Sequence, residues 1–551
     1  MLEDDSLFPA ESRVVHGLYL FLGLFVVAFS LLSLLIKERL YLSEALVATA
    51  LGVAFGPVGL DPFGALAFAS TDVGGATTHH ILLEATRVVL VVQCMAAGVS
   101  LPGDYVRREW ISLATLLGPV MICMWLVSAV GLHMILGLSI VDALVTAACI
   151  TPTDPILANS IVQGKFAERH IPVPVRQLLS AESAANDGLG LPFLLLPLFV
   201  SRYTTVGGGV GAFIWKVLLY QVLLSVVLGT LIGYAAQRAL KYAERHNLVD
   251  KESMLSFSIA LGIMVMGGMT LMGSDDVLAS FVAGTVLTWD HWFNKQFAES
   301  HFQESIDLLL NLAYFVLFGL VIPWDSYDSA PALEVWRLLL AAAWVLAFRR
   351  LPAVFLFRKW IPAIHSAREA VFAGWFGPIG GGAIFYSMMA IVYFDVPASP
   401  IFPITCFIVL CSIIVHGGTV SLFQLGISRH STYRDWRNIG TGTRSAVRAA
   451  IVNMPAPPRL IAEAAVVDVS SHTVCIPNEI PSEDEEERED RAEMKVNIED
   501  DPPNEIPNQV EARAKHVEME VKVQEATVAK QEQVEMKEKT EQDNASEQQH
   551  D

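Results

Sequence analysis

Thirteen stretches of mostly apolar residues follow one another along this chain, and they restrict its fold more than any other feature. A helix of about 20 such residues is long enough to cross the hydrocarbon core of a bilayer. Inside that core every backbone polar group needs a partner within the protein, and helices provide one. The sequence therefore predicts an all-α membrane protein with about 13 transmembrane helices. The predicted spans cover residues 15–36, 43–60, 80–102, 110–136, 140–162, 175–200, 212–238, 254–273, 276–290, 306–325, 333–348, 367–394 and 401–427.

Lysine and arginine are distributed unevenly among the connections between these spans. The connections after odd-numbered spans carry them, whereas the connections after even-numbered spans contain only Arg202. Arg349 and Arg350, just after the eleventh span, are counted here among the loop charges. Because cytosolic loops hold the excess of Lys and Arg, the pattern predicts an external N-terminus and a cytosolic C-terminus.

The formal net charge of −20 comes mostly from the C-terminal end, because residues 481–551 contain 23 acidic and 9 basic side chains. A segment dominated by Glu, Gln, Lys and Pro buries too little apolar surface to offset its ordering entropy. We expect residues 451–551 to form a disordered acidic cytosolic tail. Residues 429–450 carry arginines that suit anionic lipid headgroups and are expected to form a basic juxtamembrane segment. Residues 1–428 then form the transmembrane domain.

Several classes of function find no support in the residue pattern. No basic patch interleaved with aromatic residues indicates a nucleic-acid partner. The six cysteines do not follow metal-ligand spacing, and no phosphate-binding loop of the Walker type is present. We therefore expect no cofactor and no ATP-driven step.

Two predicted spans contain residues that break helices. The fifth includes Thr-Pro-Thr-Asp-Pro at residues 151–155, and the twelfth includes Gly-Pro-Ile-Gly-Gly-Gly at residues 377–382. Proline removes a backbone donor and clashes with the preceding turn, so both helices should be interrupted. An offset of seven spans places the breaks in two six-helix repeats of inverted orientation, a plan of secondary transporters. Two independent kinks are the alternative interpretation.

The sixth predicted span carries an unusual set of polar residues, Glu182, Ser183, Asn186 and Asp187. Residues three and four apart share a helix face, so the last three project together. A charged side chain in the middle of a membrane helix costs about 2.5–3.5 kcal/mol on insertion scales, and such residues are functional by default. Together with Asp154 on the broken fifth span, they predict a polar site inside the membrane.

The chemistry of this site suits a small hard cation, which prefers oxygen ligands. Thr153, Asp154, Ser183 and Asp187 offer hydroxyl and carboxylate oxygens, and we predict a Na⁺ site at these four residues. The same carboxylates bind protons. A site that holds either a cation or a proton, but not both, couples opposing fluxes by competition. The residue types do not distinguish Na⁺ from Li⁺ or K⁺.

The motif at residues 151–155, followed by Ala-Glu-Ser-Ala-Ala-Asn-Asp-Gly at residues 181–188, resembles the fungal plasma-membrane branch of the sodium/proton antiporters. These belong to the monovalent cation:proton antiporter superfamily. The resemblance extends from the first predicted span to the last. It implies a multi-pass homodimer in the plasma membrane that exports cations and supports pH and salt homeostasis. One domain would dimerise, and the other would move the site across the membrane.

The resemblance also implies roles for individual residues of the site. Asp187 would be the principal carrier of cation and proton, with Asn186 orienting it. Asp154 would be the second acid, and Thr153 and Ser183 would contribute oxygens.

The resemblance breaks down at one point, the expected basic partner of Glu182. Many relatives have an arginine where this chain has Ile379, and Arg368 is only a distant candidate. Glu182 therefore remains a secondary candidate with no assigned partner. The alternative interpretation of Glu182 and Asp187 is that they pair with internal basic residues for helix packing.

Three further acids are secondary candidates. Asp275 and Asp276, which open the ninth span on its outer side, are interpreted either as a cation-gathering feature of an outer funnel or as a solvated helix N-terminus with a capping role. Glu84 lies three residues before Arg87, and an intrahelical ion pair is the favoured interpretation.

Three alternative functions remain open at this stage. The first keeps the fold and makes it a K⁺/H⁺ antiporter. The second is an intramembrane lipid-modifying enzyme with a metal at residues 274–276, although no nucleophile and base are evident and we expect no enzyme. The third is a receptor or scaffold acting through the tail, whose cytosolic partners the sequence does not indicate. The substrates expected for the main hypothesis are Na⁺, Li⁺, K⁺ and H⁺, within a lipid bilayer.

Overall fold

The chain divides into two compact units, Met1–Val447 and Arg448–Asp551. The computed structural model describes residues 10–34, 36, 43–59, 72–155, 157–158, 171–290, 292–293, 302–429, 466–468 and 473–475. In the second unit it describes two antiparallel strands, β1 (Val466–Asp468) and β2 (Thr473–Cys475), with Val466 opposite Cys475. The remainder of the predicted tail, residues 451–551, and nearly all of the predicted basic segment, residues 429–450, lie outside the described residues.

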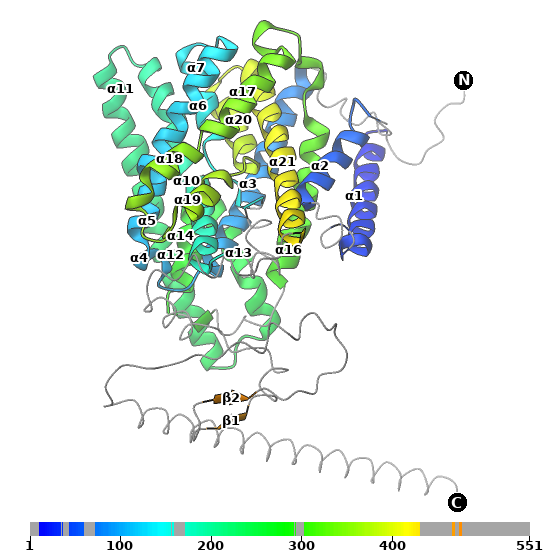
Figure 1. Ribbon diagram of the computed structural model, residues 1–551. Coiled ribbons are helices and arrows are strands. Elements are labelled where there is room, and N and C mark those ends of the chain that lie inside the picture. Colours follow the sequence, from blue (N-terminus) through cyan, green and yellow to red (C-terminus); the bar gives the residue numbers. More distant parts are fainter. Residues whose placement is uncertain are drawn as a thin grey trace, which may run out of the picture. The chain divides into compact units, whose positions relative to one another are not determined.

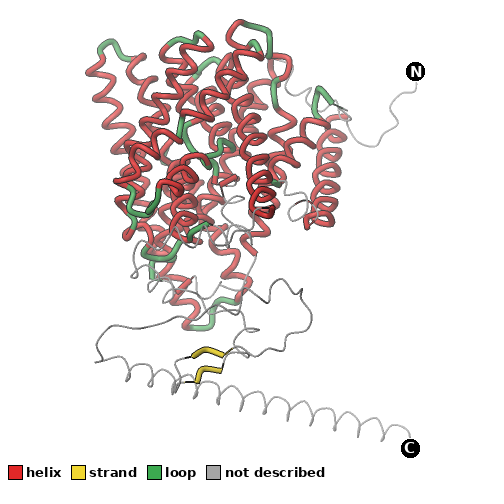
Figure 2. The backbone as a smooth tube through the Cα atoms, in the orientation of Figure 1, coloured by secondary structure: helices red, strands yellow, loops and turns green. Residues whose placement is uncertain are grey.

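The first unit is helical, and short loops join its helices (Figures 1 and 2). Its first part comprises α1 (Ala10–Leu34), α2 (Glu44–Phe55), α3 (Asp72–Ser100), α4 (Tyr105–Arg108), α5 (Trp110–Thr115), the π-helix η2 (Leu116–Val120), α6 (Met121–Leu136), α7 (Ile140–Ile150) and α10 (Val173–Arg202). A continuous stretch of α11 (Val206–Phe213), the π-helix η3 (Ile214–Leu223) and α12 (Leu224–Arg245) follows. The last part comprises α13 (Lys251–Leu271), α14 (Asp276–Leu287), α16 (Phe302–Val321), the 3₁₀ turns η4 (Trp324–Ser326) and η5 (Pro331–Leu333), α17 (Val335–Phe348), α18 (Leu351–Phe357), the 3₁₀ turn η6 (Arg358–Trp360), α19 (Ala367–Trp375), α20 (Gly381–Phe394) and α21 (Ala398–Arg429).

Seven helical stretches of the described chain are long and apolar enough to cross a membrane. They are His79–Ser100, Trp110–Leu136, Val173–Arg202, Val206–Arg245, Leu308–Ser326, Val335–Trp360 and Pro400–Thr419. Shorter apolar helices occupy the positions of the other predicted spans, at Leu20–Ser33, Glu44–Phe55, Ile140–Ile150, Ser256–Leu271, Asp276–Leu287 and Gly381–Phe394. The prediction of an all-α membrane protein is confirmed, whereas the number of helices that cross the bilayer stays a prediction.

Local sequence explains where the helices next to the candidate site begin. Ser139 caps α7 by accepting a hydrogen bond from the backbone N–H of Asp142 at 3.1 Å, and Ser366 caps α19 through Glu369 at 3.2 Å. Such caps satisfy backbone donors that the first turn leaves free. Pro172 precedes α10, where a missing N–H has no consequence.

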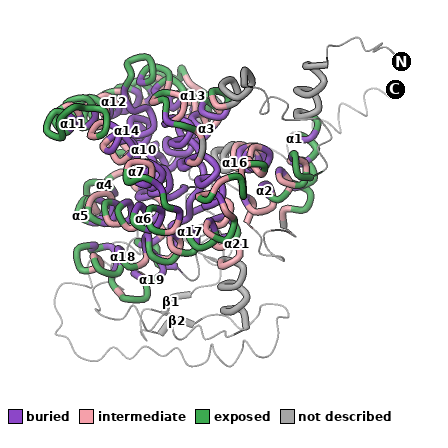
Figure 3. The backbone as a smooth tube through the Cα atoms, turned by 90° about the horizontal axis from the view of Figure 1, so that it is seen from above, coloured by how far each residue is buried: buried purple, intermediate pink, exposed green. Residues whose placement is uncertain are grey.

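Buried helices surround the centre of the first unit, as the view in Figure 3 shows for α3, α10 and α14. Helix α3 packs against α10, α13, α14 and α20, and α7 packs against α6, α10, α20 and α21. The stretch Val206–Arg245 is mostly not buried and carries exposed apolar side chains such as Trp215 and Leu231. Such a surface is favourable against lipid and unfavourable against water.

Candidate functional site

The fifth predicted span is broken at the expected residues. Helix α7 ends at Ile150, and residues 151–155 are buried, with Thr153 and Asp154 outside regular structure. The carbonyls of Ile150, Thr151 and Pro152 are left without helical donors by this break. All three accept hydrogen bonds from the Arg349 guanidinium, at 3.0 Å for Thr151 and 3.4 Å for Pro152. Non-helical backbone at membrane depth needs such internal partners.

The twelfth predicted span is also broken, between α19 and α20, and the two breaks lie against each other. The backbone N–H of Asp154 donates to the carbonyl of Pro378 at 2.9 Å. Arg349 also donates to the carbonyl of Gly377, so one guanidinium serves both breaks. The backbone approaches this closely because Gly380 has no side chain, and a Cβ there would overlap the Asp154 carboxylate.

Asp154 binds the beginnings of two helical segments. Its Oδ1 accepts from the backbone N–H of Leu157 at 2.9 Å, and its Oδ2 accepts from the N–H of Gly381, the first residue of α20. Backbone N–H groups and the helix dipole both favour negative charge at these positions. The structure therefore holds this carboxylate through backbone donors from both broken spans.

Helix α10 brings the predicted polar residues to the first break. Asn186 clamps Thr153: its Oδ1 accepts from the Thr153 backbone N–H at 3.1 Å, and its Nδ2 donates to the Thr153 hydroxyl at 2.8 Å. The Thr153 and Ser183 hydroxyls lie 3.4 Å apart. The Asn186 amide thus binds Thr153. Its expected role in orienting or stabilising Asp187 stays a prediction.

Asp187 differs from its neighbours because neither carboxylate oxygen has a hydrogen-bond partner among the described residues. The side chain is 1% exposed. Its backbone carbonyl accepts from the hydroxyl of Tyr386, and a Cβ at Gly382 would press against Oδ1. Asp187 and Asp154 therefore both border the first residues of α20. A buried carboxylate without protein donors is rare and needs a proton or a cation for compensation.

The donor set of this cluster is one of hard oxygens. Two carboxylates and the hydroxyls of Thr153 and Ser183 lie close together, whereas no group of three or more His, Cys, Asp or Glu side chains converges among the residues that the structure describes. Such oxygens suit an alkali cation and do not resemble a transition-metal site.

Glu182 forms a buried ion pair with Arg350, so its interpretation as part of an internal ion pair is confirmed, whereas the placement of Arg350 in a loop is wrong. Arg350 Nη2 lies 2.7 Å from Glu182 Oε2, and Nη1 binds Oε1. Glu182, Arg349 and Arg350 are each at most 3% exposed, so the two arginines are interior groups and not loop charges. The candidate Arg368 is exposed. At the position where many relatives have an arginine, the backbone N–H of Ile379 donates to Ser412 Oγ at 2.7 Å.

A family model described as "Sodium/hydrogen exchanger, transmembrane" matches residues 25–425 of the chain. The chain belongs to this sodium/hydrogen exchanger family. A probable Na⁺/H⁺ antiporter of Schizosaccharomyces pombe is 42% identical over 434 residues, which are 75% of this chain and 56% of that protein. An Na⁺/H⁺ antiporter of Saccharomyces cerevisiae is 41% identical over 441 residues, 76% of this chain and 44% of that protein. This exchanger chain thus spans about half the length of these relatives.

Two further comparisons agree with the family. Another Na⁺/H⁺ antiporter of Schizosaccharomyces pombe is 32% identical, and the alignment covers 76% of this chain and 92% of that protein. The solved structure of the sodium proton antiporter MjNhaP1 from Methanocaldococcus jannaschii matches with a TM-score of 0.56 at 18% identity, over 76% of this chain and 100% of that one. The exchanger therefore has the antiporter fold and is a multi-pass membrane protein.

The two acids before the ninth predicted span lie in a second polar cluster of the exchanger. Asp275 and Asp276 are 5% and 4% exposed, so the interpretation as a solvated helix N-terminus is wrong. The capping role is confirmed, since Asp275 Oδ1 accepts from the Leu278 N–H at 2.9 Å. Asp275 Oδ2 is buried and has no hydrogen-bond partner in the described chain.

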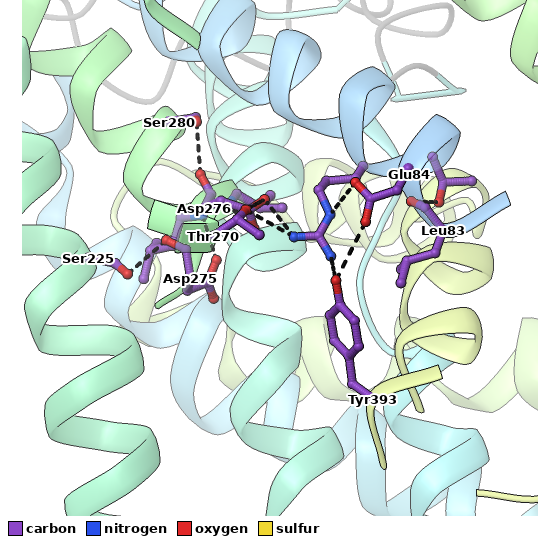
Figure 4. A network of polar contacts seen from close by, with 12 residues as sticks. Leu83, Glu84, Ser225, Thr270, Asp275, Asp276, Ser280 and Tyr393 are labelled. Atoms are coloured by element: carbon purple, nitrogen blue, oxygen red, sulfur yellow. Dashed lines mark hydrogen bonds and ion pairs between the residues drawn. The ribbon is translucent and has the colours of Figure 1, made fainter. Parts of the chain in front are cut away.

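Arg87 of α3 joins Asp276 of α14 to α13 and α20. Its guanidinium contacts Asp276, Thr270, Glu84 and Tyr393, the four residues that Figure 4 labels around it. Nη1 lies 3.2 Å from Asp276 Oδ2, and Nη2 donates to the Tyr393 hydroxyl at 2.7 Å. The predicted intrahelical pair with Glu84 is present at 3.4 Å, and the Glu84 side chain is 54% exposed. None of the contacts described for Glu84, Asp275 or Asp276 reaches the Asp187 carboxylate.

Replacing Arg87 by Ala is expected to destabilise the exchanger by about 3–5 kcal/mol, because the buried Asp276 loses its counter-charge. Glu84→Ala removes the exposed partner of the same arginine and should change stability by at most about 1 kcal/mol. Unfolding of the two purified variants in detergent, followed by tryptophan fluorescence, measures the difference. An equal loss of stability in both variants would show that Arg87 does not stabilise the buried Asp276 carboxylate.

Sequence reasoning missed three residues that organise the site. Arg349 and Arg350 carry the signal of two adjacent arginines at the end of an apolar run, but a cytosolic loop gives the same signal. Tyr386 has no distinguishing local pattern. Its contact with Asp187 depends on how α20 packs against α10.

Proposed function

We propose that this chain is a secondary active antiporter that exchanges Na⁺ for H⁺ at Asp187, and that Li⁺ and K⁺ are alternative substrates. The observation that carries the proposal is the buried Asp187 carboxylate, which has no hydrogen-bond donor among the described residues and borders two helix breaks. The names of the relatives, each an Na⁺/H⁺ antiporter, support the same exchange.

The mechanism is competition for one negative charge. A carboxylate without protein donors is neutralised either by a proton or by an alkali cation, and each displaces the other. Asp154 is held by two backbone donors and contributes a second negative charge nearby. The Thr153 and Ser183 hydroxyls supply neutral oxygens. When the site exchanges a cation for a proton on one side of the membrane and does the reverse on the other side, the two ion gradients are coupled without ATP.

The breaks provide a reason for access from both sides. Each interrupts a span near the site, and the two extended segments meet at the bond from Asp154 to Pro378. Inverted repeats with paired broken helices are the arrangement through which secondary transporters alternate their access. We propose that this exchanger acts as a homodimer in the plasma membrane with a cytosolic C-terminus, where it exports cations.

Cation-dependent proton flux in proteoliposomes tests the proposal. Purified protein is reconstituted with a trapped pH-sensitive dye, a pH gradient is imposed, and chloride salts of Na⁺, Li⁺, K⁺ or choline are added. We expect Na⁺ to dissipate the gradient and choline to leave it intact. A response to K⁺ alone favours the K⁺/H⁺ alternative. Monodisperse, folded protein that responds to none of the alkali cations would overturn the antiporter proposal.

A further inference from the structure

One buried hydroxyl near the Asp187 site belongs to a helix that carries none of the residues discussed so far. Tyr314 lies on α16 and is 3% exposed, and its hydroxyl has no hydrogen-bond partner among the described residues. Leaving such a group unsatisfied costs about 1–3 kcal/mol, and native structures rarely do so without a reason.

The hydroxyl end of Tyr314 faces the first residues of α20. A Cβ at Gly381 would lie 3.6 Å from Tyr314 Cζ and 3.4 Å from Asp154 Oδ2, so the phenol ring and this carboxylate both lie next to Gly381. The next glycine, Gly382, faces Asp187 Oδ1 in the same way. Both carboxylates are near enough to act electrostatically on Tyr314.

The other oxygens of the site already have hydrogen-bond partners within the protein. The Ser183 hydroxyl donates to the carbonyl of Leu179 at 2.7 Å, and the Thr153 hydroxyl accepts from Asn186. Asp154 accepts two backbone N–H groups. Among the polar atoms described around the site, the Asp187 oxygens and the Tyr314 hydroxyl are the ones without a hydrogen-bond partner. A phenol oxygen has lone pairs that can bind a cation.

Helix α16 differs in its neighbours from the helices that carry the acids. It packs against α1, α2 and α3, whereas α7, α10 and α20 pack against one another, and α3 contacts α10 and α20 as well. A ligand from α16 would therefore come from a helix outside the group that carries Asp154 and Asp187.

We propose that the Tyr314 hydroxyl is a further ligand of the transported cation, supplied by α16 opposite Asp187. This inference rests on the proposed antiport at Asp187. Because the phenol oxygen binds the cation and does not carry the exchanged proton, it raises the affinity for the cation relative to the proton. The proposal also assigns to α16 a part in selecting among Na⁺, Li⁺ and K⁺.

The test compares Tyr314→Phe with Tyr105→Phe in proteoliposomes. Tyr105 is a matched control because its hydroxyl is also buried and has no hydrogen-bond partner among the described residues, but its charged neighbours are Glu109, Arg108 and Glu182. We expect Tyr314→Phe to raise the KM for Na⁺ about tenfold or more, the effect of losing one bond to a charged group. The maximal rate should stay within about twofold, since the Asp187 carboxylate is retained. Tyr105→Phe should leave the KM unchanged.

A binding measurement separates failure of this inference from failure of the proposed function. Na⁺ should raise the unfolding temperature of detergent-solubilised wild type, because a ligand that binds only the folded state stabilises it. Tyr314→Phe should need about tenfold more Na⁺ for the same rise. If the wild type is active but Tyr314→Phe leaves the KM for Na⁺ unchanged, or Tyr105→Phe raises it equally, the role of Tyr314 is overturned and the antiport proposal stands. A wild type with neither flux nor stabilisation by any alkali cation would overturn the antiport itself and this inference with it.

Discussion

Asp187→Asn is expected to abolish cation-coupled proton flux, and the lost charge interaction alone accounts for about 10- to 100-fold. The substitution keeps the size and one carbonyl oxygen of the side chain, but it removes the negative charge and the proton-binding group. An interaction with a charged group contributes about 1.5–3 kcal/mol, and about 1.4 kcal/mol corresponds to a factor of ten. No described residue donates to either Asp187 oxygen, so the charge interaction that the variant loses is with the transported ion.

The measurement is the decay of a pH gradient in proteoliposomes after addition of Na⁺, at matched protein density. Asp250→Asn is the control, since Asp250 caps α13 at an exposed position through the Ser253 N–H at 2.7 Å. Asn is an equally good cap, so this variant should transport like wild type. Flux near the wild-type rate in a folded Asp187→Asn protein would show that exchange occurs at another group.

The sequence predicted the helical segments well because their signals are local. Long apolar runs identify α5 to α6, α10 and α21, and Pro and Gly at residues 151–155 and 377–382 identify the breaks. Each signal depends on a few adjacent residues and on the requirement that lipid-exposed backbone be satisfied internally. Such local signals predict the same helices and breaks whatever the tertiary packing of the chain.

The partners of the charged residues depend on tertiary packing and were predicted less well. Arg350 follows the eleventh predicted span and Arg368 lies at the start of the twelfth, and only tertiary packing decides which one meets Glu182. Asp276 was given a solvated position as an alternative because its partner, Arg87, lies far away in sequence. Spacing along one helix predicted the shared face of Ser183 and Asn186, yet it did not show that the amide binds Thr153.

The second large effect is expected at the ion pair between α10 and α18. Arg350→Met should destabilise the protein by about 3–5 kcal/mol, because it leaves the Glu182 carboxylate buried without its counter-charge. Arg350 also donates from Nε to the carbonyl of Ala373 at 2.9 Å, so the variant loses a bond to α19 as well. Arg368→Met is the matched control. It changes an exposed arginine on α19 and should stay within about 0.5 kcal/mol of wild type.

The double variant Glu182→Leu with Arg350→Met decides whether the unpaired charge is the cause. When both partners of a buried pair are replaced by apolar groups of similar size, stability is often unchanged or even improved. We therefore expect the double variant to recover most of the stability that Arg350→Met loses, although the bond to Ala373 stays broken. Unfolding of the purified variants in detergent gives the coupling free energy through a double-mutant cycle. Losses that simply add would mean that the two side chains act independently and that their ion pair does not stabilise the fold.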